Sequence, residues 1–162
     1  LEFRRVLFRS EMGVQARWDI LEGTDEFYRV TKSIHNTLHG TGHGLTKQQQ
    51  ELFLEINRKN VDTLRLEEDI VFIHDPQPAG ILHYVTERDP NKLGAKWAWR
   101  CHLDTTESLP EVWDFLRGFV HEYDAAIFTM EEYAKEPLQI PELTIIRPAI
   151  DPRPAMRNRP EL

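Results

Sequence analysis

The chain contains three short apolar runs that each end abruptly in polar or ionisable side chains. The runs occupy residues 70–73, 97–101 and 125–128, and they are rich in β-branched, aromatic and alanine residues. Such runs predict strands buried in a parallel sheet. Amphipathic segments separate them, so we predict an α/β fold: a Rossmann-like, doubly wound parallel sheet with right-handed crossovers. The three strands should be adjacent or nearly so, with helices on both faces of the sheet.

The spacing of apolar positions also predicts the remaining elements. Thr46 and Gln49 have the spacing of a capping box that starts a helix, and a Ser-x-x-Glu pattern at residues 108–111 predicts a second helix start. Asn57 and Asn60 fall on the apolar stripe of the first of these helices, so each should have a buried partner. We expect helices at about residues 25–38, 46–64, 78–86 and 108–120, at most a short helix at 132–135, and further strands at 14–22 and 143–146.

Polar side chains follow the predicted strands at the place where ligands bind in parallel sheets. The carboxyl ends of such strands meet at one edge, and ligands occupy the crevice outside it. These side chains offer the directional donors and acceptors that a polyhydroxylated ligand needs. Each one alone also fits a cap or a turn, but the set on one edge favours a binding site. The set consists of His74, Asp75, Gln77, Arg100, His102 and Asp104.

A second group of polar residues lies on the first predicted helix. Lys32, His35, Asn36 and His39 are spaced so that they form one stripe along its surface. The stripe is either a solvated face or one wall of a sugar-binding site, because imidazole and amide groups suit hydroxyl partners.

Composition and charge exclude several classes of protein. A chain of 162 residues, 40% of them hydrophobic, suits one globular domain, and a net charge of −7 gives a nucleic-acid partner no electrostatic support. The single cysteine, Cys101, has no partner for an internal disulfide, which favours a reducing, cytoplasmic setting. No apolar run reaches the roughly 18 residues of a membrane helix, so we expect no membrane association.

The sequence patterns of other catalytic classes are missing. There is no nucleophile elbow of the hydrolase type, and the glycines at 40–44 do not form a phosphate-binding loop. Asp75 and Asp104 each lie in an isolated pair of polar residues, so we expect no metal site.

The two ends of the chain differ from its middle. Residues 1–10 contain three arginines and one glutamate and do not match the rest of the chain, so we interpret them as a non-native leader; an ordinary basic first helix is the alternative. Residues 149–162 are rich in proline and arginine, which predicts a linker without regular structure.

Several long motifs resemble one enzyme family. They read FIHDPQP at 72–78, WRCHLD at 99–104, PEVWDFL at 110–116 and YDAAIF at 123–128. All four are similar to the trehalose glycosyltransferring synthases, which are retaining family-four glycosyltransferases with the two-domain GT-B fold. The resemblance extends over about residues 13–162, and residues 150–152 and 157–159 resemble the family's entry into its second domain. The more distant trehalose-phosphate synthases share the landmarks at residues 55–58 and 74–75.

The resemblance implies transfer of glucose from a nucleotide-glucose to glucose, giving trehalose, with these sugars as the partners. Asp75 matches the aspartate that binds the acceptor sugar, His102 matches the catalytic histidine that contacts the donor sugar, and His35 matches an acceptor contact more loosely. Residues 13–148 would be the acceptor-side domain, truncated at its start, and 149–162 would lead into a nucleotide-binding domain. No cofactor is implied, and we expect this chain alone to be inactive.

Two other interpretations are compatible with the same residues. One is a trehalose phosphorylase of the same fold, in which phosphate replaces the nucleotide. The other is a non-catalytic ligand-binding module with a flavodoxin-like sheet. A homodimer is possible for the glycosyltransferase interpretation, and the sequence does not determine the nucleotide preference of the donor.

Overall fold

The computed structural model describes residues 13–64, 68–90, 94–134 and 138–148. The regions expected to be a leader, at 1–10, and a linker, at 149–162, lie outside these ranges. Within them, no helix is long and apolar enough to cross a membrane. The elements in chain order are α2 (Asp25–Leu38), α3 (Lys47–Val61), β1 (Ile70–His74), α4 (Ile81–Arg88), β2 (Lys96–Arg100), α5 (Pro110–Val120), β3 (Ala125–Phe128), the 3₁₀ turn η2 (Glu131–Tyr133) and β4 (Glu142–Ile145).

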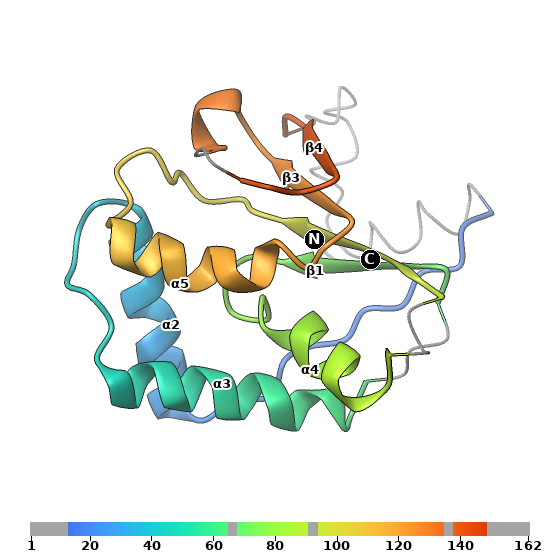
Figure 1. The fold of residues 1–162 in the computed structure, drawn as a ribbon, viewed down its shortest axis with the longest axis horizontal. Helices are drawn as coiled ribbons and strands as arrows, with labels where there is room; N and C mark the ends of the chain where they lie inside the picture. Colours follow the sequence, from blue (N-terminus) through green and yellow to red (C-terminus); the bar gives the residue numbers. More distant parts are fainter. Residues whose placement is uncertain (1–12, 65–67, 91–93, 135–137, 149–162) are drawn as a thin grey trace, which may run out of the picture.

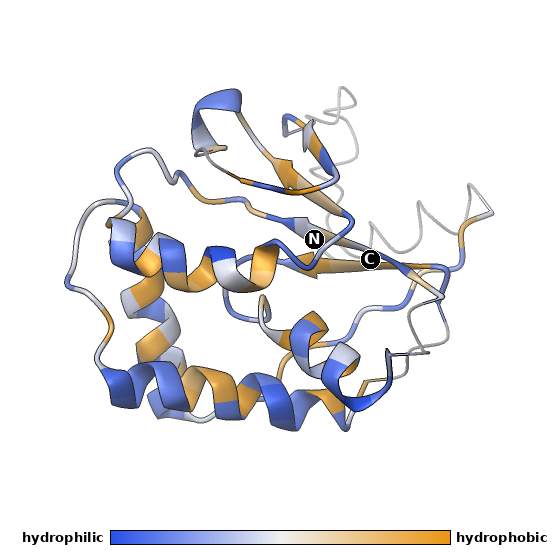
Figure 2. Ribbon diagram, viewed as in Figure 1, coloured by the Kyte–Doolittle hydropathy of each residue, from blue (hydrophilic) through white to orange (hydrophobic). Residues whose placement is uncertain are grey.

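The four strands form one parallel sheet in the order β1-β2-β3-β4 (Figure 1). The register pairs Phe72 with Ala98 and Trp99 with Ala126. The three apolar runs are therefore adjacent parallel strands, and the predicted α/β class is confirmed. In Figure 2, β1 and β3 are among the most continuously hydrophobic segments, as expected of strands inside a parallel sheet.

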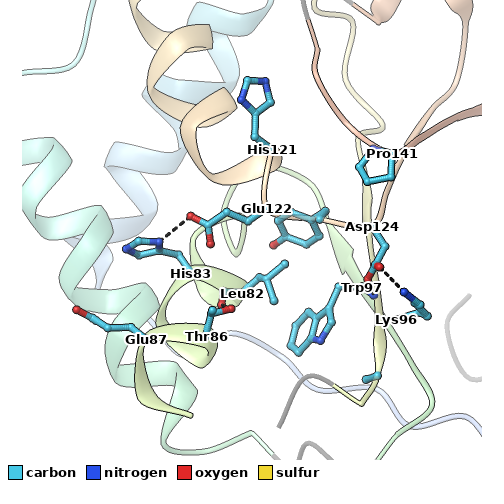
Figure 3. Close-up of a pocket in the computed structure, with 12 residues that line it drawn as sticks. Leu82, His83, Thr86, Glu87, Lys96, Trp97, His121, Glu122, Asp124 and Pro141 are labelled. Atoms are coloured by element: carbon cyan, nitrogen blue, oxygen red, sulfur yellow. Dashed lines mark hydrogen bonds and ion pairs between the residues drawn. The ribbon is translucent and has the colours of Figure 1, made fainter. Parts of the chain in front are cut away.

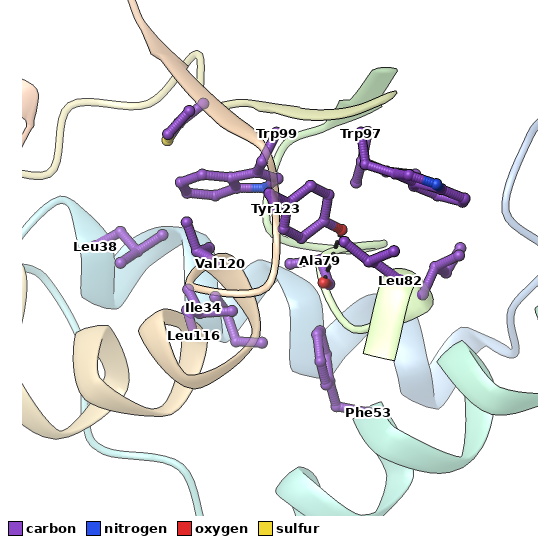
Figure 4. Close-up of a cluster of buried hydrophobic side chains, with 14 of the residues drawn as sticks. Ile34, Leu38, Phe53, Ala79, Leu82, Trp97, Trp99, Leu116, Val120 and Tyr123 are labelled. Carbon is purple, nitrogen blue, oxygen red and sulfur yellow. Dashed lines mark hydrogen bonds between the residues drawn. The ribbon is translucent and has the colours of Figure 1, made fainter. Parts of the chain in front are cut away.

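One face of the sheet packs on the helices and forms the core. Side chains alternate along a strand, so Trp97 and Trp99 of β2 point to the helical side together with Phe128 of β3. Trp99 and Phe128 have no exposed surface, and Figure 4 shows Trp99 beside Tyr123 and above α5. Tyr123 is also fully buried, and its hydroxyl donates to the carbonyl of Ala79 at 2.9 Å, which satisfies the phenol inside the core.

The expectation of helices on both faces is not met within the described residues. All four α-helices lie on one side of the sheet in Figure 1. Each strand is the neighbour of the next one in the sequence, and right-handed crossovers that advance in one direction place their helices on the same face. The other face remains open there, with Ile70 57% and Phe72 52% exposed.

The start of α3 confirms one predicted cap, whereas the start of α5 differs from the other. Thr46 and Gln49 form the full capping box before α3. At α5 the N-cap is Leu109, which makes no side-chain capping bond. Pro110 explains the shift, because the residue before a proline favours extended backbone and Leu109 takes it. Ser108 therefore stands one residue too early to cap the helix.

Residues 14–22 do not form the predicted strand. They have no assigned secondary structure and pair with none of the four strands, and Ile20 is 77% exposed. Alternation of apolar residues makes a segment suitable for a sheet, but a strand also needs a neighbour with free backbone groups. The end of the segment is fixed by Asn60, whose amide exchanges two hydrogen bonds with the backbone of Glu22.

Candidate functional site

The ends of β1 and β2 bring two of the predicted histidines together. His74 is the last residue of β1 and is paired in register with Arg100 of β2, which places His102 just beyond. The Nδ1 atom of His74 lies 3.1 Å from Nε2 of His102. The two rings are 5.4 Å apart and tilted by only 8°, so they form a stacked pair at the carboxyl edge of the sheet.

Asp75 follows β1 in an unusual backbone conformation. Its φ is +67°, and no other non-glycine residue in the described ranges has a positive φ. Its N–H donates to the carbonyl of Arg100 at 2.8 Å, and its carbonyl accepts from Nε1–H of Trp99 at 2.9 Å. Its carboxylate oxygen Oδ1 accepts from the N–H of His102 at 3.0 Å. A carboxylate has about four acceptor positions, so this bond leaves capacity for a ligand.

Helix α2 brings His35 to the same edge. Burial and the neighbouring His39 lower the pKa of His35, whereas the carboxylate of Asp75 opposes that shift. Asp75 is therefore close enough to act on His35 electrostatically. Nε2 of His35 lies 3.1 Å from Nε2 of His39. A lowered pKa favours the neutral imidazole, which has one donor and one acceptor for a hydroxyl partner.

Arg100 has a guanidinium that is committed to the protein. It is only 8% exposed, and it donates to the carbonyls of Phe128 and Ile146, each at 2.7 Å, and to Oγ1 of Thr129 at 3.2 Å. Burial lowers its pKa, but a guanidinium remains charged. Arg100 thus joins the ends of β3 and β4 on the open face of the sheet.

Asp104 and Gln77 lie in turns near this edge. Oδ1 of Asp104 accepts from N–H and Oγ1–H of Thr106 at 2.9 and 2.6 Å. The side-chain bond is the largest cause of the lowered pKa of Asp104, and His39 contributes to it. Gln77 is half-buried, and its carbonyl accepts from Nδ2 of Asn57 at 3.0 Å. The carboxylate of Asp104 therefore stabilises a local turn, which the sequence allowed as the alternative to a contact with a ligand.

Two tryptophans near the edge were not predicted as site residues, and His39 was predicted only as part of the polar stripe. Trp18 lies with its ring 5.3 Å from the ring of His74. Trp99 contacts Asp75, and His39 contacts His35. The i, i+4 spacing on the polar stripe was a signal for His39. No sequence signal distinguished Trp99 from an ordinary core tryptophan.

A hollow of about 580 Å³ lies at the opposite edge of the sheet (Figure 3). Lys96, Asp124 and Pro141 line it, and they stand at or just before the amino ends of β2, β3 and β4. A hydrogen bond between Nδ1 of His83 and Oε1 of Glu122, 2.7 Å long, forms another part of its wall. None of the predicted site residues lines this hollow. The described ranges contain no group of three or more His, Cys, Asp or Glu placed to hold a metal ion.

The comparison with known proteins identifies the family. A family model described as "Trehalose synthase, N-terminal domain" matches residues 3–135. The chain belongs to this family. It is 46% identical over 144 residues to the trehalose synthase of Thermococcus litoralis, and equally to that of Pyrococcus furiosus; each match covers 88% of this chain and 34% of the relative. The trehalose synthase of Rubrobacter xylanophilus is 39% identical over 145 residues, with the same coverage. The chain thus spans about a third of the length of these relatives.

Solved structures confirm the fold of this chain. The crystal structure of alpha,alpha-trehalose 6-phosphate synthase from Burkholderia multivorans matches with a TM-score of 0.53 at 19% identity, over 66% of this chain and 25% of that one. The apo structure of OtsA matches with a TM-score of 0.50 at 21% identity, over 67% and 26%. The resemblance seen in the motifs is confirmed, and the parallel sheet is that of the Rossmann-like N-terminal domain of GT-B enzymes.

Proposed function

We propose that this chain is the acceptor-side part of a longer, retaining glycosyltransferase that transfers glucose from a nucleotide-glucose to glucose, giving trehalose. The observation that carries the proposal is the convergence of Asp75, His102 and His35 at the carboxyl edge of the sheet. Family membership supports the choice of trehalose as the product.

The residues at this edge have complementary roles in the proposal. Asp75 accepts hydrogen bonds from hydroxyls of the acceptor glucose through its remaining acceptor positions. His35, held mainly neutral, donates to or accepts from another hydroxyl of the same sugar. His102 lies beside Asp75 and contacts the donor sugar, so acceptor and donor meet across one crevice.

The chemical contribution of these residues is orientation. In the transfer, the acceptor oxygen bonds to the anomeric carbon, the bond from that carbon to the diphosphate breaks, and the acceptor proton leaves with the departing phosphate. Holding the acceptor oxygen close to the anomeric carbon supplies the proximity part of the rate enhancement. The diphosphate needs cationic stabilisation, which the proposal assigns to the part of the enzyme outside this chain. Gln77, Arg100 and Asp104 support the strand ends and turns around the site.

Titration of the ¹⁵N-labelled chain with glucose tests the site. We expect the amide resonances of His35, Asp75 and His102 to shift. Asp75→Ala should weaken the affinity about tenfold or more, since a hydrogen bond to a charged group contributes about 1.5–3 kcal/mol. The matched control is Asp124→Ala, because Asp124 also accepts from a backbone N–H, that of Trp97 at 2.9 Å, but lies at the opposite edge.

Two results would contradict the proposal. One is a set of glucose-induced shifts that clusters around Asp124 and the hollow at the amino edge. The other is an equal loss of affinity in both variants. To separate synthase from phosphorylase, the longer enzyme is given trehalose with either inorganic phosphate or a nucleoside diphosphate. Formation of glucose 1-phosphate from trehalose and inorganic phosphate would support the phosphorylase interpretation and contradict the nucleotide-dependent one.

A further inference from the structure

We propose that Trp99 is a positioning residue of this site, which fixes the carboxylate of Asp75 by holding its backbone carbonyl. The inference rests on the proposed function, in which Asp75 binds the acceptor sugar. Trp99 lies in the core and, in this proposal, changes the affinity for the sugar only through its effect on Asp75.

The first step is that the backbone of Asp75 needs external support. A φ of +67° is unfavourable for any residue with a Cβ atom, because that atom crowds the following carbonyl oxygen. Such a conformation persists where the surroundings over-determine it. Here three hydrogen bonds from the end of β2 and the segment just after it give that support: Trp99 holds the carbonyl, Arg100 holds the N–H, and the N–H of His102 holds the carboxylate.

The second step is that the indole of Trp99 is a fixed donor. Trp99 has no exposed surface, and its ring packs edge-on against Phe128, with centroids 5.8 Å apart and an angle of 83°. The ring therefore has no room to follow a moving acceptor. A buried N–H without an acceptor also costs free energy, so the bond to the Asp75 carbonyl is favoured from both sides.

The other buried tryptophans show that this bond is specific. Trp97 and Trp113 are 2% and 4% exposed, and their indole nitrogens have no hydrogen-bond partner among the described residues. Trp113 lies in the same cluster, its ring 6.5 Å from that of Trp99. Burial in this core thus does not by itself supply an acceptor; the turn at Asp75 supplies one for Trp99.

The consequence follows from removing the indole N–H. The carbonyl of Asp75 then loses its donor, and the peptide between Asp75 and Pro76 is no longer held, so ψ of Asp75 can change and its strained φ can relax toward negative values. That rotation moves the carboxylate away from the N–H of His102 and from the sugar position. Trp99 is therefore coupled to the acceptor site through one peptide group.

Trp99→Phe tests the coupling, with Trp113→Phe as the matched control. Both changes replace a buried indole by a phenyl ring in the same cluster, but only the first removes a hydrogen bond. In the ligand-free chain, Trp99→Phe should shift the amide resonances of Asp75 and His102 and speed hydrogen exchange at the Asp75 N–H, whereas Trp113→Phe should do neither. Glucose affinity should fall about three- to tenfold more in Trp99→Phe than in the control, the range expected for one neutral hydrogen bond.

The outcomes separate this inference from the proposed function. If the wild-type chain shows no glucose-induced shift at Asp75, the proposed function fails, while the ligand-free comparison still decides whether Trp99 holds the turn. Equal shifts, exchange rates and affinities in the two variants overturn the inference. Should Trp99→Phe not fold, the indole resonances of the wild-type chain give the answer. Glucose should move that of Trp99 and leave that of Trp113, and a Trp99 resonance that stays fixed while the Asp75 amide moves overturns the coupling.

Discussion

Replacing either of two asparagines of α3 by alanine is the same chemical change in the same helix, but the two substitutions should have sharply different effects on the free energy of unfolding. The side chain of Asn60 makes three hydrogen bonds: Oδ1 accepts from the N–H of Glu22 at 2.8 Å, and Nδ2 donates to the carbonyls of Glu22 and Ile56 at 2.7 and 2.8 Å. Asn57 makes two, both through Nδ2 at 3.0 Å, and its buried Oδ1 has no partner in the described part of the chain.

The expected magnitudes follow from these contacts. At about 1 kcal/mol per hydrogen bond, Asn60→Ala loses about 3 kcal/mol. Asn57→Ala loses about 2 kcal/mol, but it also removes an unsatisfied buried oxygen that costs about 1–3 kcal/mol, so its net effect is close to zero. Helix propensity changes equally in both variants and cancels from the comparison. The difference between them should be about 2–4 kcal/mol.

Urea denaturation followed by circular dichroism measures this difference. With a slope typical of small proteins, Asn60→Ala should unfold at a urea concentration about 1–2 M below that of Asn57→Ala. The slopes of the two variants should agree, because both unfold the same surface. Equal midpoints, or a lower midpoint for Asn57→Ala, would refute the reasoning. If burial alone set the loss of stability, Asn57→Ala would be the more damaging change, because Asn57 is 0% exposed and Asn60 is 4% exposed.

Two further predictions concern the histidines of the site. If the proposed function holds, His102→Ala in the longer enzyme should mainly lower turnover with nucleotide-glucose and leave the Michaelis constant for glucose nearly unchanged, as steady-state kinetics would show. A rise in that constant alone would assign His102 to the acceptor instead. His35 has a lowered pKa in the folded chain, so below about pH 6.5 the unfolded chain binds more protons and stability falls as the pH falls through the folded-state pKa. Urea midpoints measured between about pH 7.5 and 5.5 should therefore fall less steeply with falling pH in His35→Gln than in the wild type. His43→Gln is the control, because His43 lies at an exposed loop position, and it should behave like the wild type. The same pH dependence of the midpoint in all three proteins would contradict a lowered pKa of His35.

The sequence predicts local structure here better than it predicts neighbours in space. Helix α2 has the bounds that its apolar spacing predicts, and the strands begin and end within about two residues of their apolar runs. The segment at 14–22 fails, because its alternation describes the segment alone and not the strand that would pair with it. The cap at Ser108 fails because Pro110 restricts the backbone of the residue between them.

The candidate site shows the same division. That strand ends gather polar residues follows from the parallel topology, so the neighbourhood of His74, Asp75 and His102 was predictable. The direction of each side chain was not. Arg100 points to carbonyls at the ends of β3 and β4, and the indole of Trp99 reaches the Asp75 carbonyl, because register and the left-handed turn together set those distances.

The consecutive strand order also has a consequence for how the sheet forms. Because β1, β2, β3 and β4 are neighbours in the order in which they occur in the chain, each strand can pair with one that has already been synthesised. Each new strand pairs with a strand that is separated from it by no more than one connecting helix, so the entropy cost of closing the connection stays low at each step. In a sheet where a late strand inserts between two early ones, the early strands cannot complete their pairing until the late strand has been synthesised. This sheet can grow at one edge during translation, with α4 and α5 docking as each pair of strands is completed.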